Sequence, residues 1–432
     1  MLSSLHTNIS NTAFTYNDLA GGEYWNLEGV LGQMHHMDLA ANEDIIHPVS
    51  VGYKFKSYYF TFHIADRASM YQTVPKTAAT LVIKGNSPYV GETARLNGLR
   101  TTGSYLREYA LGASKVVDQY WTLGIRAKLL FGKANISTGQ SDLQFSTDGN
   151  NFGLLLNGNY TLNSSLPITY VLDEEGNITD VTLNEFNYTE LMLNRRNPGL
   201  SVDLGAIYRW DDKVTLSASL LDLGLVRWTT DLNNVNATGN FQYDELYTDG
   251  NAVSWDFLNE FVDSIINSFD ITVTQEPYIT VLPTQLFLGG SYQIRERLSL
   301  GVVNRNLFLR SKIHSSLTLT ATSELTEGVL ATLSWSYLNN SIKNIGAGFA
   351  FYGKGLQWHV VSDNILGFFY PFDTRTINLR IGASVMFGCP RDKKSKLLSE
   401  SYGKMPKGGN CSWTDRPGKR KRQMRRAAKR QN

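Results

Sequence analysis

The segment from residue 377 to residue 387 alternates strictly between two kinds of side chain. Its odd-numbered residues are Ile377, Leu379, Ile381, Ala383, Val385 and Phe387, and the residues between them are Asn378, Arg380, Gly382, Ser384 and Met386. Successive side chains of a strand point to opposite faces, so this pattern predicts a strand with one apolar and one largely polar face. The pattern recurs about a dozen times, often over about 9–12 residues, which suits strands that cross a bilayer.

The composition is compatible with such strands and excludes a helical membrane protein. The apolar fraction is 42% and the mean hydropathy is −0.23, because only every second wall residue would face lipid. No stretch approaches the run of about 18–20 apolar residues that a spanning helix requires. Aromatic residues make up 12% of the chain, as expected for the interfacial girdles of a membrane barrel.

The connections between the alternating segments fall into two classes of length. Tight turns are expected at 211–212, 295–297, 325–328 and 353–355, and the long links at 66–102, 162–197 and 223–283. Outer-membrane barrels have short turns on the periplasmic side and long loops outside. Counting back from the last strand places every short turn on the periplasmic side.

We therefore predict an all-β fold, a single transmembrane antiparallel β-barrel of about 14 strands, over residues 1–388. Its first strand is expected within 4–14, and the count becomes 16 if 134–161 forms a hairpin within the wall. Apolar residues at i, i+3 and i+4 spacing predict an amphipathic helix over 255–269, and 77–84 reads as a shorter one. Both helices would lie in long extracellular loops, either folded into the lumen or packed against neighbouring loops.

The last 44 residues differ from the rest in charge. Residues 389–432 hold 15 Lys and Arg against three acidic residues, which leaves 26 basic and 36 acidic residues in 1–388. We interpret 389–432 as a basic, disordered periplasmic tail. Its densest part could bind a periplasmic protein or a cell-wall polymer, and nucleic acid is not expected in that compartment. The candidate contact residues are Lys419, Arg420, Lys421, Arg422, Arg425 and Arg426.

Two further observations concern the ends of the chain. Residues 1–7 have neither the basic start nor the apolar core of a signal peptide, so we expect the leader to be missing from this sequence. Both cysteines, Cys389 and Cys411, lie in the tail, where a disulfide and two free thiols are equally compatible with their spacing.

Charged residues on the polar face of the predicted strands are the candidate lumen-facing residues. An Arg or Lys on the lipid face at mid-bilayer costs about 2–4 kcal/mol, whereas in a hydrated lumen it costs little. These residues could set the selectivity of a channel or pair with one another to hold a closed lumen. They are Glu108, Arg126, Lys128, Asp203, Arg209, His359 and Arg380.

No catalytic, cofactor or metal site is predicted. His35 and His36 lack a third ligand at useful spacing, and 173–177 lacks the spacing of a calcium loop. Residues 348–354 lack the Ser or Thr that completes a phosphate-binding loop. His314 precedes two serines on a strand, but adjacent strand residues face opposite ways, so they cannot act together.

Four short strings resemble a known family. They are 14–19 (FTYNDL), 91–94 (GETA), 105–112 (YLREYALG) and 282–284 (LPT). They resemble a family of Bacteroidota outer-membrane barrel proteins known only as a domain of unknown function. That family is similar in organisation to the fourteen-stranded FadL-like fatty-acid transporters and to the type IX secretion barrel PorV. The likeness covers roughly residues 4–388 and implies an outer-membrane, porin-like barrel, while the missing leader and the basic tail depart from it.

Three classes of function follow from these observations. The first is a FadL-like conduit for small or hydrophobic molecules, and the second is a non-enzymatic scaffold or accessory for envelope secretion or assembly that docks a periplasmic partner through the tail. The third is an outer-membrane enzyme, for which no nucleophile context is present. A large soluble all-β protein with the same strands buried the other way is the alternative to a barrel. We expect a non-enzymatic conduit in contact with outer-membrane lipid.

Overall fold

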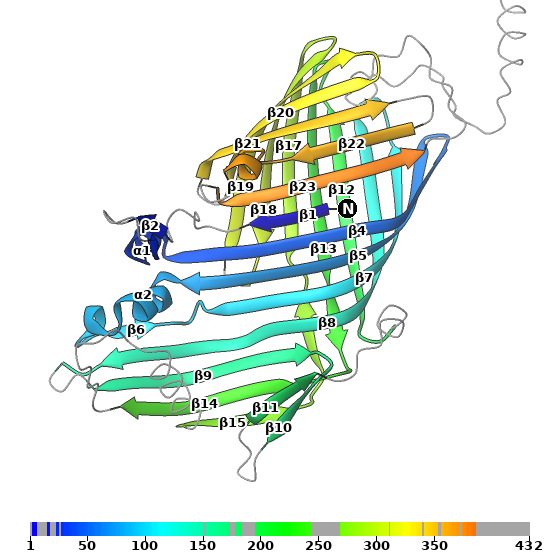
Figure 1. Ribbon diagram of the computed structural model, residues 1–432. Helices are drawn as coiled ribbons and strands as arrows, with labels where there is room; N and C mark the ends of the chain where they lie inside the picture. The colour runs from blue at the N-terminus through cyan, green and yellow to red at the C-terminus, as the bar shows by residue number, and fades with distance from the viewer. Residues whose placement is uncertain are drawn as a thin grey trace, which may run out of the picture.

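The computed structural model describes residues 2–6, 15–17, 23–25, 27–149, 153–172, 178–183, 195–243, 268–310, 312–338, 341–352, 356–370 and 374–385. One large antiparallel sheet dominates these residues (Figure 1). Fourteen of its strands pair in a continuous ring, and the ring closes because β1 pairs with β4 on one edge and with β23 on the other. The prediction of a 14-stranded antiparallel barrel is therefore confirmed.

The ring follows the order of the chain. Its strands are β1 (Leu2–His6), β4 (Met37–Phe55), β5 (Tyr58–Pro75), β7 (Arg100–Val116), β8 (Trp121–Thr147), β12 (Pro198–Arg209), β13 (Val214–Trp228), β17 (Thr284–Arg295), β18 (Leu298–Phe308), β19 (Ile313–Thr326), β20 (Val329–Leu338), β21 (Ser341–Tyr352), β22 (Leu356–Ser362) and β23 (Thr376–Val385). Each pairs antiparallel with the next. The first strand was predicted within 4–14, and β1 overlaps that segment only at residues 4–6. Residues 7–14 lie outside the described residues.

The outward face of the ring is apolar and exposed. On β19 and β20, Leu317, Leu319, Leu333 and Trp335 are between 39% and 64% exposed, and the polar residues between them face the other way. Such a face is stable only against lipid, because a soluble protein does not leave an apolar surface of this extent in water. The protein is thus a single transmembrane β-barrel.

Aromatic side chains gather on the outward face near the short turns. Trp121 and Tyr208 have ring centroids 4.6 Å apart, and those of Phe351 and Trp358 lie 4.1 Å apart. Their amphipathic rings suit the boundary between head groups and acyl chains. We call this end of the barrel the short-turn end and the opposite one the long-loop end.

The links between ring strands differ in part from the expectation. Residues 56–57, 117–120, 210–213, 296–297, 327–328 and 353–355 connect strands at the short-turn end. At the long-loop end, successive ring strands are separated in sequence by 7–36, 76–99, 148–197, 229–283 and 363–375, but also by the short segments 309–312 and 339–340. The four predicted tight turns all join strands at the short-turn end, but the two short links at the opposite end show that short connections are not confined to one end. The predicted link 66–102 was too long, because β5 and β7 continue pairing through Thr73 and Arg100.

At the turn between β12 and β13, the Asp211 carboxylate accepts hydrogen bonds from the backbone N–H groups of Lys213 and Val214, at 2.7 and 2.6 Å. These bonds stabilise the charged form, so they hold the pKa of Asp211 below its ordinary value.

Five further strands of the large sheet lie outside the ring: β6 (Thr93–Arg95), β9 (Leu154–Ser165), β14 (Asn234–Tyr243), β15 (Phe269–Thr274) and β16 (Tyr278–Val281). The far half of β8 leaves β12 and pairs with β9, which pairs with β14, which pairs with β15 (Figure 1). A hairpin thus does form around 134–161, but it extends the sheet beyond the barrel instead of adding two strands to the ring. Among the described residues the ring keeps 14 strands.

Asn197 closes the fork where β8 parts from β12. Its side-chain amide donates to the Gly132 carbonyl oxygen and to Ser165 Oγ, at 3.4 and 3.3 Å. Its Oδ1 accepts the backbone N–H groups of Thr229 and Thr230, at 2.7 and 3.1 Å. Asn197 is 1% exposed and has φ of 51°, a conformation that Asn adopts more readily than most residues. One side chain therefore holds the middle of β8 to the ends of β9, β12 and β13.

The helices lie at the long-loop end (Figure 1). They are α1 (Leu27–Gln33), α2 (Lys76–Lys84), the 3₁₀ turn η2 (Ser87–Tyr89) and α5 (Leu366–Phe369). The predicted helix 77–84 is confirmed as α2, and it packs on α1 through Leu31, Met34, Ala79 and Ile83. Two small hairpins, β2 (Thr15–Asn17) with β3 (Glu23–Trp25) and β10 (Ile168–Leu172) with β11 (Ile178–Leu183), complete the structure. The predicted helix 255–269 lies almost entirely outside the described residues.

The face assignment predicts unequal losses of stability for substitutions at two adjacent residues in the middle of β19. Leu319→Arg places a charge on the lipid face and should lower the free energy of unfolding by about 2–4 kcal/mol. Thr320→Arg, on the inward face, should cost much less. Urea unfolding in lipid vesicles measures both, and equal losses would contradict the assignment.

Candidate functional site

Five buried charged residues from five consecutive ring strands meet inside the barrel. We call Arg67, Glu108, Lys128, Asp203 and Asp222 the ion-pair layer; they come from β5, β7, β8, β12 and β13. Their side chains are between 4% and 11% exposed. Arg67 lies 2.8 Å from Asp222 and 3.4 Å from Glu108, and Lys128 Nζ lies 2.6 Å from Asp222 and 2.7 Å from Asp203.

Asp222 is the hub of this layer because the backbone of β13 bulges there. The register between β12 and β13 shifts between Val202 and Leu204, and Asp222 takes a φ of 61°. Its backbone N–H donates to Asp203 Oδ1 at 2.9 Å. The bulge turns the Asp222 carboxylate inward, where it accepts from Arg67 of β5, although three ring strands lie between them. The bond between Arg67 and Asp222 therefore links two strands that are not neighbours in the ring.

A second contact joins opposite walls of the barrel. Glu43 of β4 and Arg305 of β18 form an ion pair of 3.2 Å, although seven steps around the ring of fourteen separate their strands. Tyr71 of β5 donates a hydrogen bond to Glu43 Oε1, and Arg305 Nε donates to Gln285 Oε1 at 3.0 Å. We call the set of Glu43, Tyr71 and Arg305 the cross-lumen contact.

Apolar residues continue this closure toward the long-loop end. Leu39 and Ala41 of β4 and Tyr71 of β5 pack against Leu307 of β18, all at most 5% exposed. At the opposite end of β4, Lys54 is exposed, as are Ser50 and Gly52. Among the described residues, the long-loop half of the lumen is filled by side chains, and solvent reaches the inner wall in the short-turn half.

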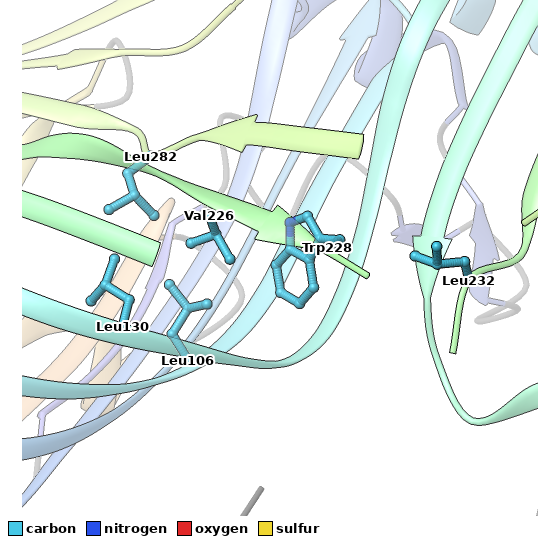
Figure 2. Close-up of a cluster of buried hydrophobic side chains, with 6 residues drawn as sticks. All are labelled: Leu106, Leu130, Val226, Trp228, Leu232 and Leu282. Atoms are coloured by element: carbon cyan, nitrogen blue, oxygen red, sulfur yellow. The ribbon is translucent and has the colours of Figure 1, made fainter. Parts of the chain in front are cut away.

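A larger apolar cluster seals the fork beside the ion-pair layer (Figure 2). Leu106, Leu130, Val226 and Trp228 point toward one another from β7, β8 and β13, with Leu282 at the end of β16. A Cβ on Gly132 would lie 2.3 Å from the Trp228 ring, so only glycine admits the indole here. Trp228 Nε1 donates to Thr280 Oγ1 at 2.8 Å, which satisfies its only polar group. β12 begins at Pro198, opposite Phe131, whereas β8 continues to Thr147. The cluster fills the gap where β8 no longer has β12 as its neighbour.

Four of the seven lumen candidates come together in the structure. Glu108, Lys128 and Asp203 belong to the ion-pair layer, and Arg126 lies at its border, 3.5 Å from Asp203 with 40% of its side chain exposed. The other three lie elsewhere on the inner wall. Arg209 donates to Thr122 Oγ1 at 3.3 Å, Arg380 lies 3.4 Å from Asp363, and His359 is exposed beside Gly382.

The sequence reading missed Arg67, Asp222, Glu43, Tyr71 and Arg305. Arg67 lies in the predicted link 66–102, and Asp222 immediately precedes the predicted link 223–283. Glu43 and Arg305 are 262 residues apart, so no local pattern connects them. The one available signal was the alternation of 66–75, where Arg67, Ser69, Tyr71 and Thr73 share a face.

Other candidates add no chemistry to the site. Among the described residues, no three His, Cys, Asp or Glu side chains are placed to hold a metal ion. His35 Nδ1 lies 3.8 Å from Asp38. The described part of the chain contains no helix long and apolar enough to span a bilayer. Residues 173–177 and the tail 389–432 lie outside the described residues.

Comparisons with known proteins find one family. The model of the family of unknown function DUF5723 matches residues 1–363. No curated protein matches the chain.

Several solved structures match the chain over most of its length. The toluene transporter TbuX of Ralstonia pickettii is 9% identical, with 88% of this chain and 86% of that chain covered and a TM-score of 0.38. The toluene transporter TodX of P. putida gives 10%, 89% and 89% with a TM-score of 0.37. A Pseudomonas aeruginosa FadL homologue gives 10%, 89% and 85% with a TM-score of 0.31. At such identities and scores these likenesses do not extend to function.

Asp222→Asn should destabilise the barrel strongly. The amide keeps the volume and tolerates the positive φ, but it leaves Arg67 and Lys128 without the carboxylate they share. Removing one partner of a buried ion pair costs about 3–5 kcal/mol. Urea unfolding measures the loss, and Asp211→Asn in the exposed turn before the same strand is the matched control. Equal stability of the two variants would show that the layer is not held by its ion pairs.

Proposed function

We propose that this chain, which belongs to the family of unknown function DUF5723, is an outer-membrane conduit for small or hydrophobic molecules that carries out no chemistry of its own. An even number of antiparallel strands, an apolar outer face and short turns at one end are the features of bacterial outer-membrane barrels. In that setting the short-turn end faces the periplasm. The family has no assigned activity. The support for a conduit comes from the side chains that face the lumen.

The observation that carries the proposal is the size of the inward-facing side chains on β13 and on β17–β23. The register of these strands places many small residues side by side around this part of the inner wall, and the larger inward-facing side chains among them include Phe287, Val303, His359 and Val361. They are Ser217, Gly289, Ser291, Gly301, Thr318, Thr320, Thr332, Ser334, Gly346, Gly348 and Gly382. A barrel that serves only as a scaffold would be expected to fill its interior with large side chains, whereas small polar ones leave room for water and solutes.

The filled half of the lumen then acts as a closure. Passage requires that Glu43 and Arg305 separate and that the apolar residues beyond them move apart. These contacts join opposite walls, so they can be broken without removing a backbone hydrogen bond from the ring. The structure described here is the closed state of the conduit.

Removing the cross-lumen contact should open the conduit. In Glu43→Ala/Arg305→Ala both long side chains are shortened together, so neither leaves an unpaired buried charge. We expect several-fold higher conductance in planar bilayers and faster swelling of liposomes in a small uncharged sugar than for the wild-type protein.

The matched control removes an ion pair from the outer face of neighbouring strands. Asp66→Ala/Arg107→Ala deletes the bidentate pair between β5 and β7, whose N–O distances are 2.8 and 2.7 Å. It should leave permeability unchanged. If neither the wild-type protein nor the opened variant passes ions or sugar, the barrel is not a conduit.

A further inference from the structure

We propose that the short-turn half of the lumen is a vestibule that attracts and binds anionic groups such as carboxylates, sulfonates or phosphates. The vestibule is defined by the inward-facing Lys54, Thr61, Thr122, Arg126, Arg209 and Ser217. The inference rests on the proposed function, because it names the charge of the molecules that enter. It depends on which charges of the inner wall are already paired and which are open to a ligand.

Three cations face the vestibule. Lys54 of β4 is exposed and shares the inward face with Ser50 and Gly52. Arg126 of β8 is 40% exposed on its side chain and makes only a 3.5 Å ion pair. Arg209 of β12 has no carboxylate within ion-pair distance among the described residues, and its single side-chain partner is the Thr122 hydroxyl.

Little of the negative charge on the same wall is open to solvent. Among the described residues that face inward here, the acids are Asp203 and Glu324. Asp203 accepts the ammonium of Lys128 at 2.7 Å and the backbone N–H of Asp222 at 2.9 Å. Glu324, at the short-turn end of β19, is 7% exposed. The accessible charge of the vestibule is therefore positive.

The two guanidinium groups still have donors to offer. Arg126 Nε and Arg209 Nε are buried without a hydrogen-bond partner. A guanidinium presents donors in a planar fork that matches the two oxygens of an anionic group. Because both Nε atoms are closed to solvent, a ligand oxygen would bind the terminal N–H groups of the two guanidinium groups.

Two glycines, followed by Thr122 and Ile207, lie between the levels of the two arginines. Arg209 reaches the level of Thr122, four residues below Arg126 on β8, which corresponds to about 13 Å along the strand. Between these levels Gly124 stands opposite Gly205, and nothing lies within 4 Å of a Cβ built on Gly205. The wall therefore leaves space for a ligand next to the unpaired donors.

Anion preference can be measured without opening the closure, through the reactivity of a cysteine in the vestibule. Ser217 is exposed and faces inward, so Ser217→Cys is placed in the full chain with Cys389→Ser and Cys411→Ser. The purified barrel is reacted with two methanethiosulfonates, one carrying a sulfonate and one a trimethylammonium group. Each rate is divided by the rate of the same reagent with 2-mercaptoethanol.

We expect the normalised rate of the sulfonate reagent to exceed that of the ammonium reagent by about tenfold, because a charged cleft concentrates counter-ions by about 10- to 1,000-fold. Arg126→Gln and Arg209→Gln should each lower the ratio, while Arg126→Lys should keep it. Lys115→Gln, which removes a cation that lies over Tyr58, should leave it unchanged. The ratio should also fall as salt is raised. A heat-dependent shift in gel mobility confirms that each variant is folded.

The outcomes separate the two proposals. Equal normalised rates for the two reagents in the folded protein would overturn the anion vestibule and leave the conduit standing. A cysteine that reacts with neither reagent would show that the short-turn half is not reached from solvent, and both proposals would fall.

Discussion

Every other feature of this protein depends on the closure of the backbone hydrogen-bond ring. In hydrocarbon no water can satisfy an exposed N–H or C=O group, so a sheet can cross a bilayer only without free edges. The five residues of β1 supply that closure, because they pair with β4 on one side and with β23 on the other. Where β8 continues beyond the first residue of β12, Asn197 and the Trp228 cluster take the place of the missing ladder.

Closure allows the interior to hold charge. Inside the ring, the ion-pair layer together with Arg126, Glu43 and Arg305 forms a balanced set of four cations and four anions. The attraction within a buried ion pair offsets the cost of removing its charges from water only if the geometry is good. Here the bulge at Asp222 provides that geometry. The same side chains that hold the walls together also block the lumen, so stability and closure share their residues.

The sequence predicted the wall of this barrel well and its interior poorly. Alternation is a local property with a strong apolar contrast, so the last strand, around Ile381, was predicted with the correct face outward. The pattern fails where strands leave the bilayer, because Arg67 and Ser69 then alternate with Asp66 and Ala68 and the contrast is lost. The fork at Gly132 and the ion pair of Glu43 with Arg305 depend on residues far apart in the chain. Glu108, Lys128 and Asp203 were placed on the inner wall by parity, but their partners could not be deduced.

The central claim is that one face of each strand meets lipid while the other faces a lumen that holds water only in its short-turn half. Spin labels placed singly along β19, from Ile313 to Thr326, report this through their accessibility to oxygen and to a water-soluble nickel complex. Oxygen access should peak at Leu317, Leu319 and Ala321. Nickel access should peak at Thr320 and Thr322 and fall at Ser316, next to Arg305. No two-residue alternation, or alternation of the opposite phase, would contradict the account.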